Sequence, residues 1–576
     1  MRRVHALAAM LLALGAVACG DNDSREGSTA PGKPVDGQQR GGTLRVLAAE
    51  DVDSIDPGLA YFQTTYMITY ATQRPLYSYE PEDRARPVPD FAARAPQVSA
   101  DGRTVTVKLR RGVSFSPPVS REATSADVKY AIERAFAASV PNGYAPTYFG
   151  DLVGAPAEPG SLRPIRGIET PDPYTVVFRL AKPVAGAFVK ALVLPVTAPV
   201  PADYARRFDA ANPSTYGSHQ VATGPYMIAN DSRGNLTGYR AGRSITLVRN
   251  PAWRSYSDFR PAYVNRVEWS IGTDPNVAGR QILRGRDLIN GDTPTAPVVK
   301  QAVTRRKDQI AFTTLGNRYI TMNTKLAPFD DVNVRRAVLA AFDRRALAAT
   351  RGGATVGHIA NHFLYPGVPG FEEAGGFETD LDFLKDPGGN PTLAAGYLKK
   401  AGYPSGRYTG REELVMVGDN ADPAAKTAQV ALDEFRKLGF RVKLRSVSSD
   451  VMNTRFCGTP KAQVAICPNF GWLPDYNDPQ AVLFAPFSGS AIAPENNTNW
   501  PQLDDPGVDA AMDRAALIRD DRRRAEAWGE IDRRITALAP AVPWFWDKTP
   551  NIQSSNVQGV IGTWNAAWDL SYTSLK

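Results

Sequence analysis

The segment Gly471–Gln480, GWLPDYNDPQ, places a tryptophan and two carboxylates close together in a stretch that reads as a loop. Trp472 lies three residues before Asp475, and a second turn-like pair, Asp478 and Pro479, follows. A carboxylate in a pocket can replace the hydration that a ligand ammonium group loses on leaving water, through a charge-assisted hydrogen bond. A tryptophan beside it adds apolar area and a cation–π attraction of about 0.5–2 kcal/mol. The segment is therefore a candidate pocket wall for a cation. A structural Asp-rich turn with Trp472 in the core and a catalytic carboxylate are the alternatives.

Motifs for catalysis or metal binding are scarce in the rest of the sequence. There is no Gly-x-Ser-x-Gly nucleophile motif. His358 and His362 are four residues apart, but Ile359 stands where a zinc protease has glutamate, and the flanking glycines and proline indicate a loop. The sequence therefore predicts no catalytic residues, no metal site and no cofactor. A cell-surface hydrolase is the competing class, and it would need a nucleophile–base pair or a metal site.

The composition is that of a globular protein with more than one domain. The 576 residues are 43% hydrophobic and 22% charged, and a chain of this length is too long for one hydrophobic core. The formal net charge of +8 comes from basic residues that are spread along the chain rather than clustered. This distribution favours a soluble surface and predicts no nucleic-acid partner.

The N-terminus carries the marks of an exported lipoprotein. Arg2 and Arg3 precede the apolar run 7–18, which is short for a membrane span and is followed at once by Cys19. Residues 1–18 therefore read as a signal peptide, and 19–41 as a lipidated flexible tether rich in Gly, Ser, Asp and Pro. This interpretation places the protein outside the cytoplasm, anchored to the outer face of the cell membrane. A plain secretory signal with an incidental cysteine is the alternative.

The two remaining cysteines, Cys457 and Cys467, lie ten residues apart with Gly-Thr-Pro between them. Outside the cell such a pair is more often bridged than free, and the turn residues favour a hairpin closed by a disulfide. Free thiols are the alternative, and a metal site would need more ligands than this segment offers.

Periodicity predicts a chain of alternating strands and helices. Residues 43–48, 104–109 and 175–180 alternate as strands, and Thr124 to Asp127 form a capping-box start to a helix. Further on, the sequence predicts strands at 319–325, 413–418 and 440–447. It predicts helices at 328–347, 392–402, 425–439, 506–518 and 522–540. Strand–helix–strand alternation of this kind indicates an α/β fold with a largely parallel sheet.

Several of these stretches together resemble one family. They are GGTLRVLAAEDVDSIDP, TVTVKLRRGVSF with ATSADVKYAIERAF, ATGPYMI, SITLVRNPAWR, LKKAGYPSG, APAVPWFW and, most closely, YITMNTKLAPFDDVNVRRAVLAAFDRRAL. The ordered set resembles the extracellular solute-binding proteins of bacterial ABC importers, in the peptide- and nickel-binding class that includes dipeptide- and oligopeptide-binding proteins. It covers nearly the whole chain after the tether. One departure is FSPP at 115–118, where the family usually has a His-Asp-Gly-like turn.

The resemblance implies an α/β, two-lobed periplasmic-binding-protein-like (Venus flytrap) fold with an extra domain inserted in the first lobe. We expect lobe I at 42–75, 205–305 and 540–576, the inserted subdomain at 76–204, and lobe II at 306–539. Hinge closure over a ligand is the switching motion that such a fold allows.

The resemblance also assigns roles to residues. Asp475 matches an aspartate that pairs with the α-ammonium group of a peptide, and Trp472 matches an aromatic wall beside it. Tyr61 and Phe62 are further pocket candidates, because their loop faces the cleft in relatives, although aromatic residues there are also plausible in the core. No residue that would bind a ligand carboxylate is evident from the sequence.

The implied function is that of a monomeric receptor that binds peptides and delivers them to an ABC permease and its ATPase subunits. A non-peptide solute such as a sugar, an opine or a metal chelate is the alternative ligand. A sensor lipoprotein without a role in transport is the alternative use of the same fold.

Overall fold

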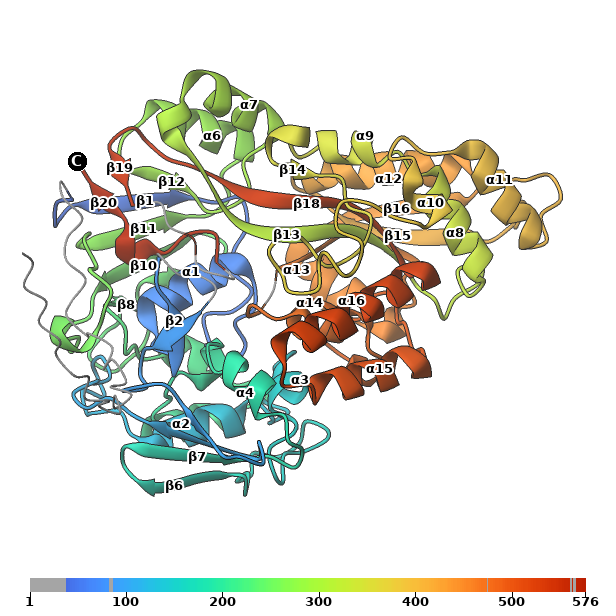
Figure 1. Cartoon of the computed structure of the whole chain (residues 1–576). Helices are drawn as coiled ribbons and strands as arrows, with labels where there is room; N and C mark the ends of the chain where they lie inside the picture. The colour runs from blue at the N-terminus through green and yellow to red at the C-terminus, as the bar shows by residue number, and fades with distance from the viewer. Residues whose placement is uncertain (1–37, 82–85, 474, 560–561, 563–565) are drawn as a thin grey trace, which may run out of the picture.

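The computed structural model describes residues 38–81, 86–473, 475–559, 562 and 566–576. Two lobes stand side by side, each built on a six-stranded sheet, and a smaller region lies beside the first lobe (Figure 1). The predicted signal peptide 1–18, Cys19 and most of the predicted tether lie outside the described residues. None of the described helices has the length and apolar character that a bilayer span requires.

The sheet of the first lobe has the strand order β12-β1-β11-β10-β8, and β9 pairs with β10. β1 runs parallel to β11 and β12, whereas β10 is antiparallel to β11 and β8. The strands are β1 (Thr43–Leu47), β8 (Tyr226–Ile228), β9 (Tyr239–Arg240), β10 (Ser244–Arg249), β11 (Arg266–Ser270) and β12 (Leu288–Asn290). Helix α1 (Gln63–Thr72) packs Met67 and Ile68 into the same core as Leu44 and Val46 of β1. Helices α6 (Pro275–Arg284) and α7 (Ala296–Arg305) lie at the other side of this lobe (Figure 1).

The sheet of the second lobe has the strand order β14-β18-β13-β17-β15-β16. β15 runs parallel to β16 and β17, but β13 is antiparallel to β17 and β18. The strands are β13 (Ile310–Met322), β14 (Gly357–His358), β15 (Glu413–Asp419), β16 (Arg441–Val447), β17 (Ile466–Trp472) and β18 (Ala541–Ile552). The prediction of a largely parallel sheet is therefore right for only one half of it, because β13, β18 and the short β14 pair antiparallel in the other half.

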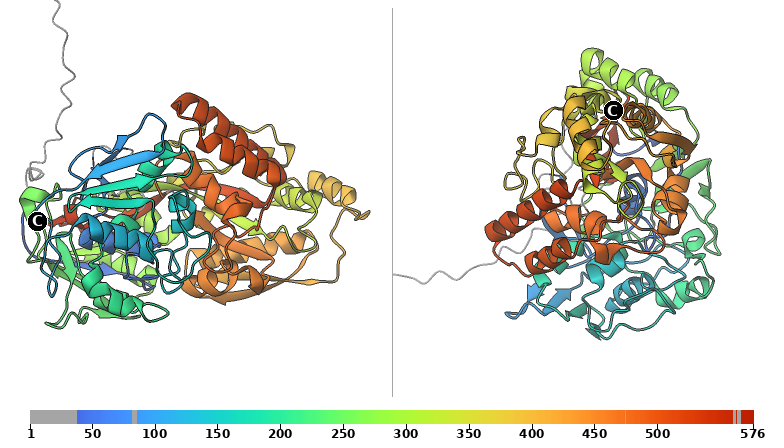
Figure 2. Two further views of the ribbon diagram at one scale, coloured as in Figure 1. Left: turned by 90° about the horizontal axis from the view of Figure 1, so that it is seen from below. Right: turned by 90° about the vertical axis from the view of Figure 1, so that its right-hand side faces the viewer.

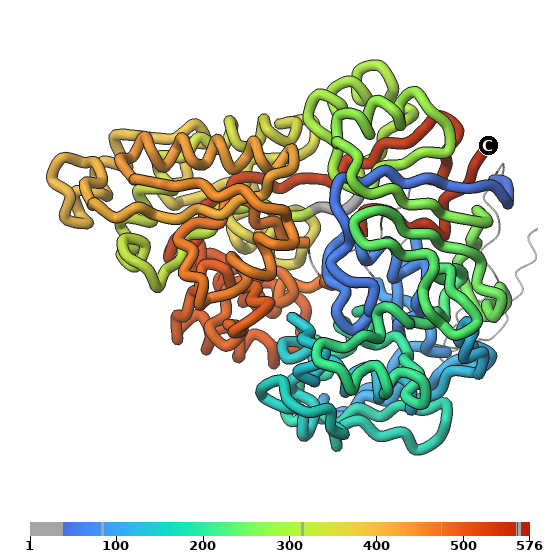
Figure 3. Tube along the Cα trace, turned by 180° about the vertical axis from the view of Figure 1, so that it is seen from behind, coloured from blue at the N-terminus to red at the C-terminus, as the bar shows by residue number. Residues whose placement is uncertain are grey.

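These two long strands, β13 and β18, connect the lobes. They run side by side from the first lobe into the second, and the reverse view shows the same arrangement (Figures 1 and 3). At the end of β18 the backbone N–H of Ile552 donates to Oδ1 of Asn290 in the first lobe at 2.6 Å. The predicted lobe boundaries stay a prediction. Within the range 540–576, β18 pairs with strands of the second sheet.

The inserted region has its own sheet, in the order β4-β5-β7-β6. Its elements are β2 (Tyr77–Tyr79), β3 (Pro87–Pro89), β4 (Gln97–Val98), β5 (Thr104–Lys108), β6 (Ile168–Asp172), β7 (Thr175–Arg179), α2 (Ser125–Arg134), α3 (Ala145–Phe149), α4 (Ala185–Ala191) and α5 (Ala202–Asp209). The predicted capping box is confirmed, since Oδ2 of Asp127 accepts the backbone N–H of Thr124 at 2.8 Å. The core of this region also contains Tyr476 and Ala481 from the second lobe, so the two regions share buried contacts.

The predicted single helix at 328–347 is wrong, because it is two helices. α8 (Val332–Ala341) begins after Asp331, whose side chain accepts from the backbone of Asn333. Phe342 is extended, and the side chain of Asp343 then caps α9 (Arg344–Ala349) by accepting from the backbone of Ala346. An aspartate that bonds to backbone N–H groups ahead of it competes with helix continuation, which explains the break.

The remaining helices cover the second lobe. They are α10 (Asp382–Lys385), α11 (Pro391–Lys400), α12 (Ala424–Lys437), α13 (Ser449–Val451), α14 (Pro479–Phe487), α15 (Pro506–Ala516) and α16 (Asp521–Leu538). The pair α15 and α16 stands next to the inserted region (Figures 1 and 2). Arg519, between these two helices, donates to the backbone oxygen of Ala100 at 2.9 Å. The inserted region therefore contacts the second lobe, and Arg134 of α2 also pairs with Asp56 in the first lobe at 2.7 Å.

Candidate functional site

A cavity of about 350 Å³ lies where the two lobes meet. It is at the carboxyl ends of β1 and β12 in the first lobe and of β15 and β17 in the second. Carboxyl ends of parallel strands are the usual place for ligands in α/β sheets. Charged side chains at the wall are Glu50, Asp51, Asp292, Arg318, Arg351, Asp419, Asp422 and Asp475. The volume is within the range of small-molecule sites.

Asp475 lies at the wall of this cavity, just beyond β17, and only 3% of it is exposed. The hydroxyl of Tyr148, in α3 of the inserted region, donates a hydrogen bond to Oδ2 of Asp475. Burial raises the pKa of Asp475 to about 7, and the hydrogen bond from Tyr148 opposes this shift. The site is therefore assembled from the second lobe and the inserted region together, with a carboxyl group that is costly to ionise where it lies.

Tyrosines gather around Asp475. They are Tyr61, Tyr66, Tyr79, Tyr144, Tyr148, Tyr365 and Tyr476. Burial is the main cause that raises the pKa values of their hydroxyl groups, and the negative charge of Asp475 raises these values further. Their rings make close contacts: Tyr61 stacks on Tyr144 with 5.6 Å between centroids, and Tyr148 meets Tyr476 edge-on at 5.2 Å. A carboxylate among aromatic faces suits an ammonium group, because both attract a cation.

Trp472 is both a cavity wall and a core residue. It is 4% exposed, its indole N–H donates to the backbone oxygen of Ala481 at 2.7 Å, and its ring is stacked on Phe470 at 5.9 Å. Tyr61 lies beside it, with ring centroids 6.1 Å apart. Phe62 lines the same cavity and directly precedes α1. The structure thus brings all four sequence-derived binding candidates to one cavity.

Asp478, three residues after Asp475, has a different environment. It caps α14 by accepting the backbone N–H of Gln480, and it forms ion pairs with Lys190 at 2.7 Å and Arg524 at 2.8 Å. Although burial opposes the shift, Arg524 and Lys190 lower the pKa of Asp478. This carboxylate is structural, because it joins α4 of the inserted region to α16 of the second lobe.

Two arginines at the cavity wall share one carboxylate. Nε of Arg318 lies 2.9 Å from Oδ1 of Asp547 on β18, and Nε of Arg351 lies 2.9 Å from Oδ2 of the same carboxylate. Burial lowers the pKa of Arg351 to about 10, and the charge of Arg318 lowers it further. Two guanidinium groups and one carboxylate leave this cluster of three residues with one net positive charge at the cavity. The sequence carried no signal for this cluster, because the three residues come from separate parts of the chain: Arg318 from β13, Asp547 from β18, and Arg351 from the segment after α9.

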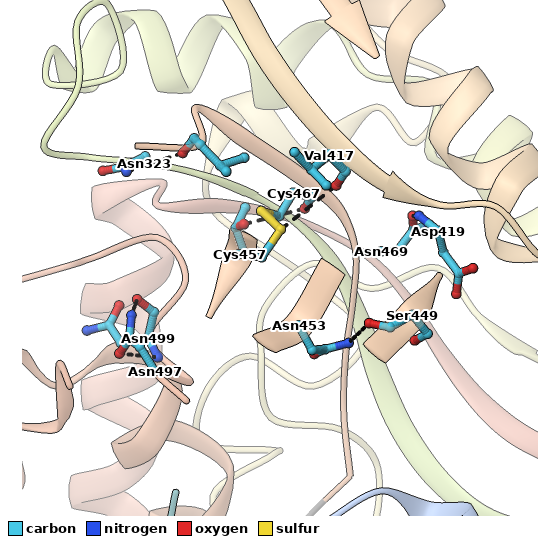
Figure 4. Close-up of a disulfide and its surroundings, with 12 residues drawn as sticks. Asn323, Val417, Asp419, Ser449, Asn453, Cys457, Cys467, Asn469, Asn497 and Asn499 are labelled. Carbon is cyan, nitrogen blue, oxygen red and sulfur yellow. Dashed lines mark hydrogen bonds between the residues drawn. A yellow bond between two sulfur atoms is a disulfide. The ribbon is translucent and has the colours of Figure 1, made fainter. Parts of the chain in front are cut away.

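Cys457 and Cys467 form a disulfide beside the cavity-lining segments (Figure 4). Cys467 belongs to β17, and Cys457 ends a π-helical turn, Met452–Cys457, that follows α13. The predicted hairpin is wrong, since the bridge joins a helical turn to a central strand. The bridge fixes the turn that supplies Met452 and Asn453 to the cavity wall against the strand that ends in Trp472.

His362 has a structural role. It is buried, with Nδ1 2.8 Å from Oδ2 of Asp532 and Nε2 2.9 Å from the backbone oxygen of Gly376. Over the ranges that the structure describes, no group of three His, Cys, Asp or Glu residues is arranged to hold a metal ion.

Comparison with known proteins identifies the family. The model of "Bacterial extracellular solute-binding proteins, family 5 Middle" matches residues 86–494. The glutathione-binding protein GsiB of Salmonella choleraesuis (strain SC-B67) is 24% identical over 480 residues, which cover 83% of this chain and 84% of that protein. The di/tripeptide-binding protein 2 of Pseudomonas aeruginosa (strain UCBPP-PA14) is 26% identical over 551 residues, which cover 92% and 95%.

A solved structure, clavulanic acid biosynthesis oligopeptide binding protein 2, superposes with a TM-score of 0.76 at 28% identity and covers 93% of this chain and 96% of its own. The predicted family resemblance and fold class are confirmed by these matches. Members of the matched family are solute-binding proteins rather than enzymes. Because the family match spans well over half of the sequence, this chain belongs to the bacterial extracellular solute-binding proteins of family 5.

Proposed function

We propose that the protein binds short peptides in the interlobe cavity, with Asp475 as the partner of the peptide α-ammonium group. The observation that carries this proposal is the buried carboxyl of Asp475 at the cavity wall, among tyrosines and beside Trp472. Relatives that align over most of the chain are named as di/tripeptide-binding and glutathione-binding proteins, which supports a peptide-like ligand.

The energetics favour an ammonium group over a neutral one. Burial makes ionised Asp475 costly, and a ligand cation beside it would lower its pKa and recover that cost through a charge-assisted hydrogen bond. The same cation would meet the faces of surrounding aromatic rings, each worth about 0.5–2 kcal/mol. An uncharged amide in this place would gain neither the charge-assisted hydrogen bond nor the cation–π attraction.

Arg318 and Arg351 are our candidates for the partner of a ligand carboxylate. They line the cavity together and share the single carboxylate of Asp547, so one positive charge is left over. A planar guanidinium group suits bidentate carboxylate binding. Asp475 and this pair would then bind the two ends of a short peptide.

The proposed biological role is capture outside the cytoplasm and delivery to an ABC permease and its ATPase subunits. Cys19 would carry the lipid that anchors the protein to the outer face of the cell membrane, and the protein would act as a monomer. Closure of the lobes about β13 and β18 would give the permease a ligand-dependent surface. The strands are suited to this role because they are the long connections between the two sheets.

The first test is native mass spectrometry of freshly purified protein, followed by denaturation to identify whatever is bound. Short peptides would support the proposal, whereas a single non-peptide mass would overturn it. The second test is calorimetric titration of ligand-free protein with Ala-Ala and with N-acetyl-Ala-Ala. Acetylation should weaken binding at least 30-fold, because an ammonium partner of a buried carboxylate contributes about 2–5 kcal/mol. Equal affinities for the two peptides would show that Asp475 is not the partner of the α-ammonium group.

The matched variants are Asp475→Asn and Asp504→Asn. Asp475→Asn should weaken Ala-Ala binding to the same extent as acetylation, and the two losses should not add. Asp504 is an exposed carboxylate paired with Lys325 at 2.8 Å, away from the cavity wall, so its variant should bind as the wild type does.

A further inference from the structure

Three further carboxylates of the cavity wall play no part in the proposed ammonium site. Glu50 follows β1, Asp292 follows β12, and Asp419 ends β15. The first two belong to the first lobe and the third to the second lobe. They therefore face the same cavity from both sides of the interlobe boundary.

Hydrogen bonds connect the three carboxylates to two short segments, one at Ser449 and the other at Ala49. The backbone N–H of Ser449, at the start of α13, donates to Oε1 of Glu50 at 3.3 Å, and Ser449 also bonds to the side chain of Asp419. Oδ2 of Asp292 accepts the backbone N–H of Ala49, next to Glu50. Asp419 and Ser449 lie on neighbouring segments of the second lobe (Figure 4).

The three groups repel one another electrostatically. Burial, followed by the charge of Asp419 and more weakly that of Asp292, raises the pKa of Glu50 to about 7. Burial raises the pKa of Asp292 to about 6 and also raises that of Asp419. The neighbouring charges that contribute most to the pKa shifts of Glu50 and Asp292 are those of other carboxylates. Asp419 is buried, and Glu50 and Asp292 are half-buried. Carboxylates that are withdrawn from water are usually paired with cations, so a positive group from the ligand would suit this place.

The other carboxylates of this part of the lining have partners in the protein. Asp422 pairs with Lys426 at 2.6 Å, and Asp51 accepts from Tyr239 and from the backbone of Gly242. Arg318 and Arg351 share Asp547, and their one spare positive charge is assigned above to a ligand carboxylate. Among the described residues these two arginines are the basic groups of the lining. The lining therefore keeps an excess of negative charge.

A second observation points to a ligand in this cavity. The hydroxyl of Thr549 on β18 lies at the wall, the residue is 5% exposed, and its oxygen has no hydrogen-bond partner among the described residues. The side-chain nitrogen of Gln63, also at the wall, has none either. Buried polar groups without partners are rare in folded proteins, so both indicate that polar ligand atoms complete the site.

We propose that the cavity has a second cation subsite, formed by Glu50, Asp292 and Asp419, and that its occupant is the basic side chain of an arginine- or lysine-containing peptide. This inference rests on the proposed peptide-binding function and narrows the substrate class to ligands with two positive groups. A metal ion is the competing occupant, but no cluster of the described carboxylates is close enough to hold one. A guanidinium group, which is broad and presents five N–H donors, matches carboxylates that approach from two lobes.

The test compares peptides that differ only in the charge of one side chain. Ligand-free protein is titrated calorimetrically at pH 7.5 and low salt with Ala-Arg and Arg-Ala, and with the same dipeptides carrying citrulline in place of arginine. Citrulline keeps the shape and loses the charge. We expect at least one arginine dipeptide to bind more than tenfold tighter than its citrulline counterpart. Equal affinities within both pairs would overturn the subsite.

Variants test whether these carboxylates cause the preference for arginine over citrulline. Glu50→Gln combined with Asp292→Asn should bring the arginine-to-citrulline ratio close to one. Glu413→Gln changes an exposed carboxylate at the other end of β15, the strand that carries Asp419, and should keep the full ratio. A ratio that persists in the double variant would overturn the assignment. The comparison in wild-type protein stands even where a variant does not fold.

Two further outcomes separate this inference from its competitors. If neither neutral nor basic dipeptides bind, the proposed peptide-binding function fails; if both bind equally, only the second subsite fails. Titration with calcium chloride in the absence of peptide tests the metal alternative. Calcium binding that is lost in the double variant would replace the basic side chain by a metal ion, whereas no calcium binding is expected.

Discussion

Asp475→Asn should stabilise the ligand-free protein at high pH while it weakens peptide binding. The carboxyl is 3% exposed, and burial raises its pKa from the ordinary value of 3.8 to about 7. The folded state therefore binds this proton more tightly than the unfolded state does. Ionisation of Asp475 costs stability above pH 3.8, and the cost grows until the pH passes about 7. Full ionisation of Asp475 therefore lowers the free energy of unfolding by about 4 kcal/mol, from roughly three pKa units at about 1.4 kcal/mol each.

The assay is urea denaturation of refolded, ligand-free wild type and Asp475→Asn at pH 5 and pH 8. Asparagine keeps the shape and can still accept the hydrogen bond from Tyr148. From pH 5 to pH 8 the free energy of unfolding of the variant, relative to wild type, should rise by about 2–3 kcal/mol. About two of the three pKa units over which ionisation of Asp475 destabilises the wild type fall in that range. Other groups with raised pKa values, such as Glu50 and Asp292, are the same in both proteins and cancel in the difference.

Asp504→Asn is the matched control, since this carboxylate is half exposed and an exposed ion pair contributes about 0–1 kcal/mol. Its stability difference from wild type should be small and almost the same at both pH values. The reasoning is refuted if the difference between Asp475→Asn and wild type does not change with pH, or if the variant is the less stable protein at pH 8.

Four further outcomes are expected. The affinity for Ala-Ala should fall about tenfold per pH unit below pH 7, as Asp475 takes up the proton that the ammonium ligand must displace; calorimetry at pH 5 and pH 7 checks this, and a flat profile contradicts it. Asp478→Asn should lower the free energy of unfolding by about 3–5 kcal/mol in urea, because it leaves Lys190 and Arg524 without their buried partner, and a neutral effect would contradict the structural role. Cys457 and Cys467 should resist iodoacetamide until a reductant is added, and prompt labelling would mean free thiols. Cys19→Ala should move the protein from the membrane fraction to the soluble fraction, and continued attachment would exclude the lipid anchor.

The sequence predicted local structure well where local interactions decide it. Strands with clean alternation, such as 104–109, and the capping box at Thr124 and Asp127 are found where periodicity and capping place them. The helix at 328–347 shows the limit, because Asp343 caps a new helix in the middle of a continuous apolar pattern. The length of β13 was also missed, since its first part pairs with β18, more than two hundred residues away.

The site was predictable only in the part that lies in one segment. Trp472 and Asp475 are close in sequence and come to the same cavity wall. Tyr148 could not be found, because it reaches Asp475 from an inserted region 327 residues earlier. The same reason hides the three carboxylates of the second subsite, because they lie at the ends of three different strands and Asp419 meets the other two only across the boundary between the lobes.

The pair Asp475 and Asp478 shows why residue type and spacing do not settle function. Both carboxylates are buried in one short segment, yet burial dominates at the first and raises its pKa, whereas Arg524 and Lys190 reach the second and lower its pKa. The first is thus suited to receive a cation from a ligand, and the second already holds two from the protein.

The same contrast bears on the closure of the lobes that is proposed above. The ion pairs of Asp478 attract the inserted region to the second lobe whatever the ligand. Glu50 and Asp419, which line the cavity from different lobes, repel each other, and this repulsion strengthens as the cavity loses water. A neutral ligand would leave that repulsion in place, whereas a basic side chain between the two carboxylates would turn it into attraction. Selectivity for a second positive charge would therefore arise from the free energy of closing the lobes as well as from direct contact with the ligand.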